Sequence, residues 1–184
     1  MTPRDAERGP TDAGPGPSTP TAEEPTRRDP APDVLDDALG SWDPDTDTDR
    51  VTFIGRLEMR KGVLDLARAI PHVLDEHPEA QFRFIGRSLD HPKTGEDLRT
   101  LMERELHPHS ELVEFTGPVP YEQIPHYLAD TDLCVFPSLW ENFPNVCLEA
   151  MSAARGVVGS RAGGMREMLD DGTYGEYEEY NLTG

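Results

Sequence analysis

From residue 50 onward, short apolar segments alternate with longer amphipathic ones, and this alternation limits the folds open to the chain. The pattern predicts five strands, at Val51–Ile54, Gln81–Ile85, Leu112–Phe115, Asp132–Phe136 and Val157–Ser160. It predicts helices between and after them, at Gly62–His77, Gly95–Leu106, Tyr121–Ala129, Asn145–Ala154 and Met165–Leu169. Strands that alternate with helices form right-handed βαβ units and a parallel sheet. We therefore expect an α/β, Rossmann-like domain with helices on both faces of its sheet. Residues 172–184 have no clear period, and the pattern assigns them no element.

The first 49 residues have a different composition. They contain nine of the 18 prolines and are rich in aspartate and threonine. Such a segment cannot bury enough apolar surface to offset its ordering entropy, so we expect a disordered acidic tail at 1–49 and a folded domain at 50–184. The run Asp45–Asp49 resembles the start of a calcium loop, but Arg50 and Arg56 stand where that loop needs Gly and Glu. We predict no metal site.

Charge and composition exclude several classes of partner. The formal net charge of −19 argues against nucleic acid, whose phosphates need Lys and Arg. No apolar stretch is long enough to cross a bilayer, and the first residues lack the apolar core of a signal peptide. The two cysteines, Cys134 and Cys147, lie in apolar runs and are expected to be buried thiols. These features predict a cytoplasmic protein.

A basic turn, Gly55–Gly62, follows the first predicted strand. Arg60 and Lys61 stand just before a helix, where the positive end of the helix dipole disfavours cations. A bound phosphate removes this conflict, because the helix N–H groups and the cations then face an anion. Taken alone, the same turn is better explained as an exposed basic loop.

Glu141 and Glu149 flank the point where the fourth predicted strand passes into a helix. Pro144 suits the first helical turn and Asn142 suits the cap, which places Glu141 in the loop and Glu149 in the helix. A diphosphate would repel both carboxylates, so we expect them to accept hydrogen bonds from hydroxyl groups, one on a transferred group and one on a ribose. Either glutamate alone could instead compensate the helix dipole.

Two adjacent glycines, Gly163 and Gly164, precede the last predicted helix. Glycines at such a position let the backbone approach a ligand and point N–H groups at it. Most double glycines are ordinary turns, so this pair carries weight only beside the other motifs.

Taken together, these motifs resemble the nucleotide-sugar-binding half of the family 4 (group 1) retaining glycosyltransferases, which have the GT-B fold. The resemblance runs from about Val51 to Gly175. The segments that carry it, in order, are Gly55-Arg56-Leu57 with Lys61-Gly62, Phe84-Ile85-Gly86, Phe115-Thr116-Gly117-Pro118-Val119, Ala129-Asp130-Thr131-Asp132, Pro137-Ser138, Glu141-Asn142-Phe143, Leu148-Glu149-Ala150-Met151 and Gly163-Gly164.

The resemblance implies a role for each site residue. Arg56 and Lys61 would bind the donor diphosphate and stabilise the departing nucleotide. Glu149 would hold the ribose hydroxyls, and Glu141 would lie near the transferred sugar. Backbone N–H groups at Asn142-Phe143 and at Gly163-Gly164 would complete the site. The cations make a metal or other cofactor unnecessary, and the donor would be a UDP-, GDP- or ADP-sugar.

The chain also departs from the family pattern. Ala154 and Gly156 stand where the family usually has Gly and Pro, and Asn142-Phe143-Pro144 replaces a glycine-containing version. Ala154 is expected to crowd its turn.

From the resemblance we expect the chain to lack the amino-terminal acceptor domain and the last helices of the GT-B fold. This predicts a glycosyltransferase part that works with an acceptor domain on another chain. The alternatives are a catalytically inactive nucleotide-sugar-binding module and, less favoured by the paired glutamates, a nucleotide-sugar epimerase.

Overall fold

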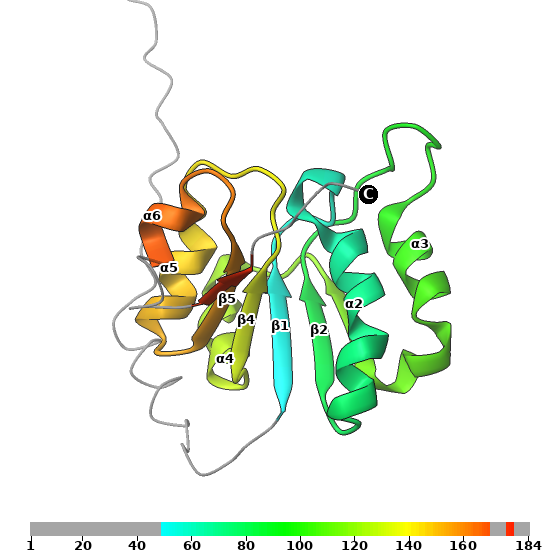
Figure 1. Ribbon diagram of the computed structural model, residues 1–184, viewed down its shortest axis with the longest axis horizontal. Coiled ribbons are helices and arrows are strands. Elements are labelled where there is room, and N and C mark those ends of the chain that lie inside the picture. The colour runs from blue at the N-terminus through cyan, green and yellow to red at the C-terminus, as the bar shows by residue number, and fades with distance from the viewer. Residues whose placement is uncertain (1–48, 170–175, 179–184) are drawn as a thin grey trace, which may run out of the picture.

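The fold is a parallel six-stranded sheet, shown in Figure 1. The computed structural model describes residues 49–169 and 176–178. The strand order is β3-β2-β1-β4-β5-β6, and every neighbouring pair is parallel. The strands are β1 (Arg50–Ile54), β2 (Gln81–Ile85), β3 (Val113–Gly117), β4 (Leu133–Phe136), β5 (Gly156–Ser160) and β6 (Glu176–Glu178). This order confirms the predicted Rossmann-like fold.

The predicted strands are all present, with bounds within two residues of those predicted, and the structure adds one more. β6 falls inside the stretch to which the pattern assigned no element, and it pairs with β5 from Val158↔Glu176 to Ser160↔Glu178. The predicted disordered tail lies, apart from Asp49, outside the described residues.

Helices cover both faces of the sheet. They are α2 (Val63–Glu76), α3 (Leu98–Glu105), α4 (Ile124–Ala129), α5 (Asn145–Ser152) and α6 (Met165–Leu169), with short 3₁₀ turns η1 (Met59–Lys61), η2 (His107–Leu112) and η3 (Tyr121–Gln123). Alternating strand residues point to opposite faces, which divides the core in two. Phe53 and Phe84 pack with α2 and α3, whereas the next residues along, Ile54 and Ile85, pack with α4, α5 and α6.

Two helices begin three residues later than predicted, each for a local reason. The helix expected from Gly95 begins at Leu98, because the Asp97 side chain accepts a hydrogen bond from Thr100 N at 2.9 Å and caps it. The helix expected from Tyr121 is divided into η3 and α4, and Pro125 occupies the first turn of α4.

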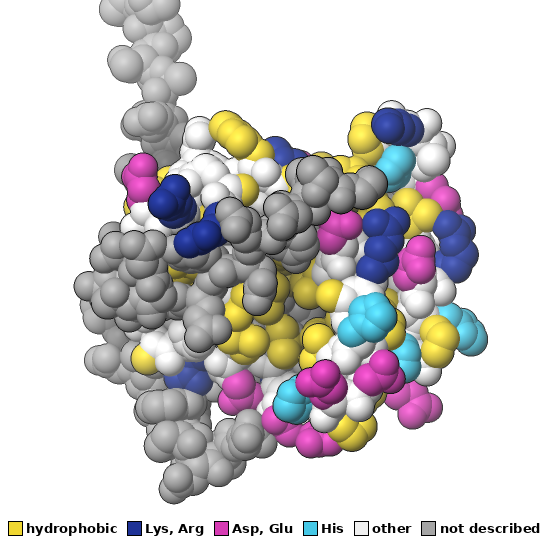
Figure 2. Space-filling model, in the orientation of Figure 1, with side chains coloured by type: hydrophobic (Ala, Val, Ile, Leu, Met, Phe, Trp, Pro, Cys, Tyr) yellow, Lys and Arg dark blue, Asp and Glu magenta, His cyan; other side chains and the backbone are white. Residues whose placement is uncertain are grey.

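The α2–α3 face contains most of the phenylalanine side chains of the core. The Phe84 and Phe115 rings are stacked with centroids 5.0 Å apart, and Phe53 lies 6.0 Å from Phe84. β4 and β5 contribute the half-buried Val135 and Val158 to the same side of the sheet. Figure 2 shows apolar side chains gathered at the centre of this face.

The core of the opposite face combines large side chains, such as Phe136 and Met165, with smaller groups, among them both cysteines. Cys134 and Cys147 are fully buried and unpaired, which confirms the prediction of buried thiols. Burial raises the pKa of Cys134 to about 12 and that of Cys147 to about 11, so both remain protonated at neutral pH.

The strand order creates a topological switch between β1 and β4. These strands are neighbours, but the chain leaves β1 toward β2 and leaves β4 toward β5. In open α/β sheets, ligands bind beyond the carboxyl ends of the strands at such a point. The loop from β1 to α2 and the loop from β4 to α5 meet at this edge, at the upper end of the sheet in Figure 1.

Candidate functional site

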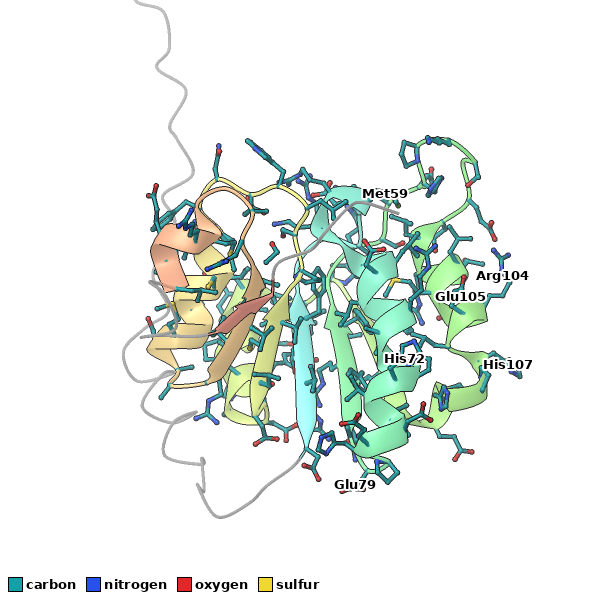
Figure 3. The ribbon with its side chains drawn as sticks, in the orientation of Figure 1. Met59, His72, Glu79, Arg104, Glu105 and His107 are labelled. Carbon is teal, nitrogen blue, oxygen red and sulfur yellow. The ribbon has the colours of Figure 1, made fainter. Side chains whose placement is uncertain are left out.

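The β1–α2 and β4–α5 loops are held together by their backbones. Leu139 N donates to Arg60 O at 2.9 Å. Gly62, between η1 and α2, has φ +67°, and a Cβ atom there would lie 1.9 Å from Pro137 O. Only glycine therefore allows the start of α2 to approach the β4–α5 loop so closely. In Figure 3, Met59 marks this position at the upper end of the sheet.

Side-chain charges join the same two loops. Lys61 Nζ donates to Glu141 Oε2, and Arg60 Nη1 donates to the same oxygen at 3.4 Å. The structure thus brings together Lys61 and Glu141, two predicted site residues 80 positions apart in the sequence. Glu141 lies in the loop and Glu149 in α5, as expected. The ion pair between Glu141 and Lys61 was not predicted, because only hydroxyl partners were expected for the carboxylate.

The pKa of Glu141 reflects two opposing effects. Its side chain is only 12% exposed, and this burial by itself raises the pKa of the carboxyl group. The hydrogen bond from Lys61 and the charges of Lys61 and Arg60 outweigh burial, so the net pKa lies below the ordinary value. Glu141 is therefore an anion at neutral pH, suited to accept hydrogen bonds or to stabilise positive charge.

A third cation completes the cluster. Glu58 accepts from Arg60 Nη2 at 2.9 Å and from Arg56 Nη2 at 3.2 Å, and the Arg56 side chain is 53% exposed. Three cations and two carboxylates leave an excess of one positive charge at this edge, in a chain whose formal net charge is −19. The arrangement can attract an anion to a chain that otherwise repels it.

Glu149 lies on α5, where its carboxylate has one satisfied oxygen. Tyr121 OH donates to Glu149 Oε1 at 3.1 Å. Glu149 Oε2 is buried and has no hydrogen-bond partner among the described residues. A buried carboxylate oxygen without a donor is costly, and a hydroxyl group of a ligand would remove that cost.

Asn142 and Phe143 lie in the exposed part of the β4–α5 loop. Asn142 N donates to Glu141 Oε1 at 3.3 Å, so this amide is used to orient the carboxylate. The expectation that Asn142 caps α5 is wrong: the helix begins at Asn145, and its N-cap is Pro144 without a side-chain hydrogen bond. Phe143 is 54% exposed, beside the equally exposed Trp140, whose ring lies 5.9 Å from the Arg60 guanidinium.

Gly163 and Gly164 pack directly against the Glu141–Asn142 backbone. Gly164 N donates to Glu141 O at 2.9 Å. A Cβ atom at Gly163 would lie 1.9 Å from Glu141 O, and the φ of this residue is +61°. The glycines therefore fix the loop that carries Glu141, and a direct contact with a ligand stays a prediction.

Three residues of the site were not singled out from the sequence: Glu58, Tyr121 and Trp140. Glu58 and Trp140 stand beside predicted site residues in the sequence, and Tyr121 follows the loop after β3. The only sequence signal that could have identified these three residues was their position after the carboxyl ends of predicted strands.

Other features of the described residues lie apart from this edge. A cavity of about 320 Å³ opens between α3, η2 and β3, and none of the predicted site residues lines it. No group of three or more His, Cys, Asp or Glu side chains within the described ranges is arranged to hold a metal. None of the helices described is both long and apolar enough to cross a membrane.

Comparison with known proteins identifies the family. Residues 48–180 match the family described as glycosyl transferases group 1. The chain belongs to this family. Its fold matches the C-terminal domain of a glycosyl transferase group 1 family protein from Francisella tularensis, with a TM-score of 0.63 and 20% identity over 78% of this chain and 80% of that one.

Curated relatives within the family are longer than this chain. D-inositol 3-phosphate glycosyltransferase of Corynebacterium kroppenstedtii is 32% identical over an alignment of 131 residues, and the match covers 68% of this chain and 28% of the relative. Alpha-maltose-1-phosphate synthase of Mycolicibacterium smegmatis is 28% identical over 153 residues, 83% of this chain and 38% of the relative. The chain thus spans 28% and 38% of the length of these two relatives.

Solved structures of the same fold include one with a bound nucleotide sugar. Anabaena Alr3699/HepE in complex with UDP-glucose superimposes with a TM-score of 0.63 and 24% identity, over 82% of this chain and 40% of that one.

Proposed function

We propose that this group 1 domain binds a nucleoside diphosphate sugar and serves the transfer of the sugar, with retention of configuration, to an acceptor held by a separate domain or chain. The observation that carries the proposal is the junction of Lys61, Arg60 and Glu141 at the switch between β1 and β4. A positive excess beside an uncapped helix start suits a diphosphate.

Lys61 and Arg56 both bind the diphosphate. An ammonium group has three N–H donors, so Lys61 can keep its bond to Glu141 while it donates to a phosphate oxygen. Arg56 is exposed enough to turn from Glu58 toward the ligand. As the nucleotide departs, negative charge accumulates on the β-phosphate, and both cations stabilise it.

Glu149 and Glu141 bind the two sugar rings of the donor. The buried Oε2 of Glu149 is an acceptor in need of a donor, which supports a ribose hydroxyl there. Glu141, kept ionised by Lys61 and Arg60, would lie beside the transferred sugar and stabilise positive charge at its anomeric carbon. The amides of Asn142-Phe143 and Gly163-Gly164 would line the same position. The Anabaena structure with UDP-glucose, of the same fold, supports this class of donor.

Calorimetric titration with UDP-, GDP- and ADP-sugars tests donor binding. We expect at least one to bind, and Lys61→Ala to weaken it about 10- to 100-fold, the effect of losing a hydrogen bond between charged groups. Arg104→Ala is the control, because Arg104 pairs with Glu96 on the outer side of α3, away from the site (Figure 3). The proposal fails if the wild-type chain binds none of these donors.

A turnover assay separates an enzyme part from a binding module. We expect release of free sugar or transfer only when an acceptor-binding domain is added to the donor-bound chain. Turnover by the isolated chain would contradict the need for a second domain. Donor binding with no turnover under any pairing would favour the inactive module.

A further inference from the structure

Tyr121 connects the β3 edge of the sheet to the helix that carries Glu149. It begins η3, shortly after β3 ends, and its ring packs against the apolar cluster under α4, α5 and α6. Its hydroxyl group donates to Glu149 Oε1 at 3.1 Å, across 28 positions of sequence. The ring is therefore fixed by packing, and the hydroxyl group is the part that meets the site.

This one bond leaves the Glu149 carboxylate half satisfied. Oε1 has its donor, whereas Oε2 is buried and has no partner among the described residues. A carboxylate that accepts a bond from a fixed donor cannot rotate freely about its last torsion. The Tyr121 hydroxyl group thus decides which oxygen is left without a donor.

We propose that Tyr121 is a positioning residue for ribose recognition: its hydroxyl group holds Glu149 Oε1 so that Oε2 is presented to the ribose diol of the donor. The inference rests on the proposed function, since it concerns the ribose of the same ligand. Holding the carboxylate in its bound orientation before the ligand arrives lowers the entropy lost on binding.

Tyr121→Phe removes the hydroxyl group and keeps the ring in its apolar contacts. The ligands are the nucleoside diphosphate that the wild-type chain binds best, chosen among UDP, GDP and ADP, and its 2′,3′-dideoxy form. We expect Tyr121→Phe to weaken the ribose-containing ligand about threefold to tenfold, the effect of one lost hydrogen bond. We expect the affinity for the dideoxy ligand to stay unchanged.

The double variant Tyr121→Phe/Glu149→Ala shows whether the hydroxyl group acts through Glu149. If it does, Tyr121→Phe has no further effect once Glu149 is Ala, so the two losses do not add. A merely structural role would weaken both ligands equally, because the dideoxy form keeps the diphosphate and the base.

Three outcomes would overturn the inference: an equal loss for both ligands, additive losses in the double variant, or tighter binding by Tyr121→Phe, which would mean that the hydroxyl group competes with the ribose. In each of these the wild-type chain still binds the nucleotide, so donor binding stands. If the wild-type chain binds no nucleoside diphosphate, the proposed function falls and this inference falls with it.

Discussion

The two faces of the sheet are packed differently, and only one of them carries the glutamates of the site. The α2–α3 face is filled by large side chains such as Phe53 and Phe84. The face under α4, α5 and α6 uses small groups where α5 meets the sheet, including Cys147 and Ala150. Small groups let a helix lie close to a sheet. We therefore expect Phe53 and Phe84 to contribute more stability than the small groups of the second face, which let α5, with Glu149, lie close to the sheet.

Truncation of a buried side chain on each face, the large Phe84 on one and the small Cys134 on the other, should give the largest contrast. Phe84 is 1% exposed and contacts two further aromatic rings, so Phe84→Ala should lower the free energy of unfolding by about 3–5 kcal/mol. Cys134→Ala on the other face removes one buried sulfur and should cost about 1 kcal/mol. Urea denaturation measures both, and equal losses would refute the contrast. If Phe84→Ala fails to fold, Phe84→Leu should still be destabilised by about 1 kcal/mol.

A methyl group added at a glycine should lower the free energy of unfolding most where the glycine packs beside the site. Gly163 and Gly95 have similar φ values, +61° and +71°, but a Cβ atom would overlap the Glu141 backbone only at Gly163. Gly163→Ala should lower the free energy of unfolding by about 2–4 kcal/mol, the sum of backbone strain and overpacking. Gly95→Ala should cost about 1 kcal/mol, from strain alone. Equal losses of unfolding free energy in the two variants would disprove the close packing of Gly163 against the loop that carries Glu141.

Ala154 has a strained backbone conformation, and relieving that strain should stabilise the chain. Ala154, between α5 and β5, has φ +54°, a left-handed conformation that costs a residue with a Cβ atom about 1 kcal/mol. Ala154→Gly should raise the free energy of unfolding by somewhat less than about 1 kcal/mol, because glycine also gains freedom in the unfolded chain. Thermal unfolding would show a higher Tm, and a lower Tm would contradict the assignment of strain.

The smallest expected effect is the pH dependence that comes from Glu141. Its pKa in the folded chain lies below the ordinary value of 4.5, so its ion pairs stabilise the fold fully above that pH and are lost as the pH falls through the folded pKa. The difference in unfolding free energy between the wild-type chain and Glu141→Gln should therefore shrink below pH 4.5. A difference that stays constant from neutral pH to acid would contradict the ion pair. In a Lys61→Ala background the shrinkage should be smaller.

Local pattern predicted most of the fold. Gln81–Ile85 was placed to the residue, and β1, β4 and α2 to within one, because a buried strand or an amphipathic helix repeats its apolar residues at a fixed period. β6 was not predicted, since a three-residue segment of Glu, Tyr and Glu is too short and too polar to show a period.

The site was predicted less completely than the fold, because its contacts are long-range. The positions of Lys61 and Glu141 at the carboxyl ends of strands follow from the alternation of elements. Their ion pair depends on β1 and β4 becoming neighbours, which is decided by the strand order and not by either segment. The hydrogen bond from Tyr121 to Glu149 could not be predicted for the same reason, because it joins two segments that only the fold brings together.

A crystal structure of the chain with the nucleotide sugar that binds most tightly tests the central claim most directly. The account predicts the diphosphate against Lys61 and Arg56 at the start of α2, and the ribose on Glu149 Oε2, with Tyr121 still bonded to Oε1. A ligand bound elsewhere, for example in the cavity between α3 and β3, with the Lys61–Glu141 edge unoccupied, would contradict it.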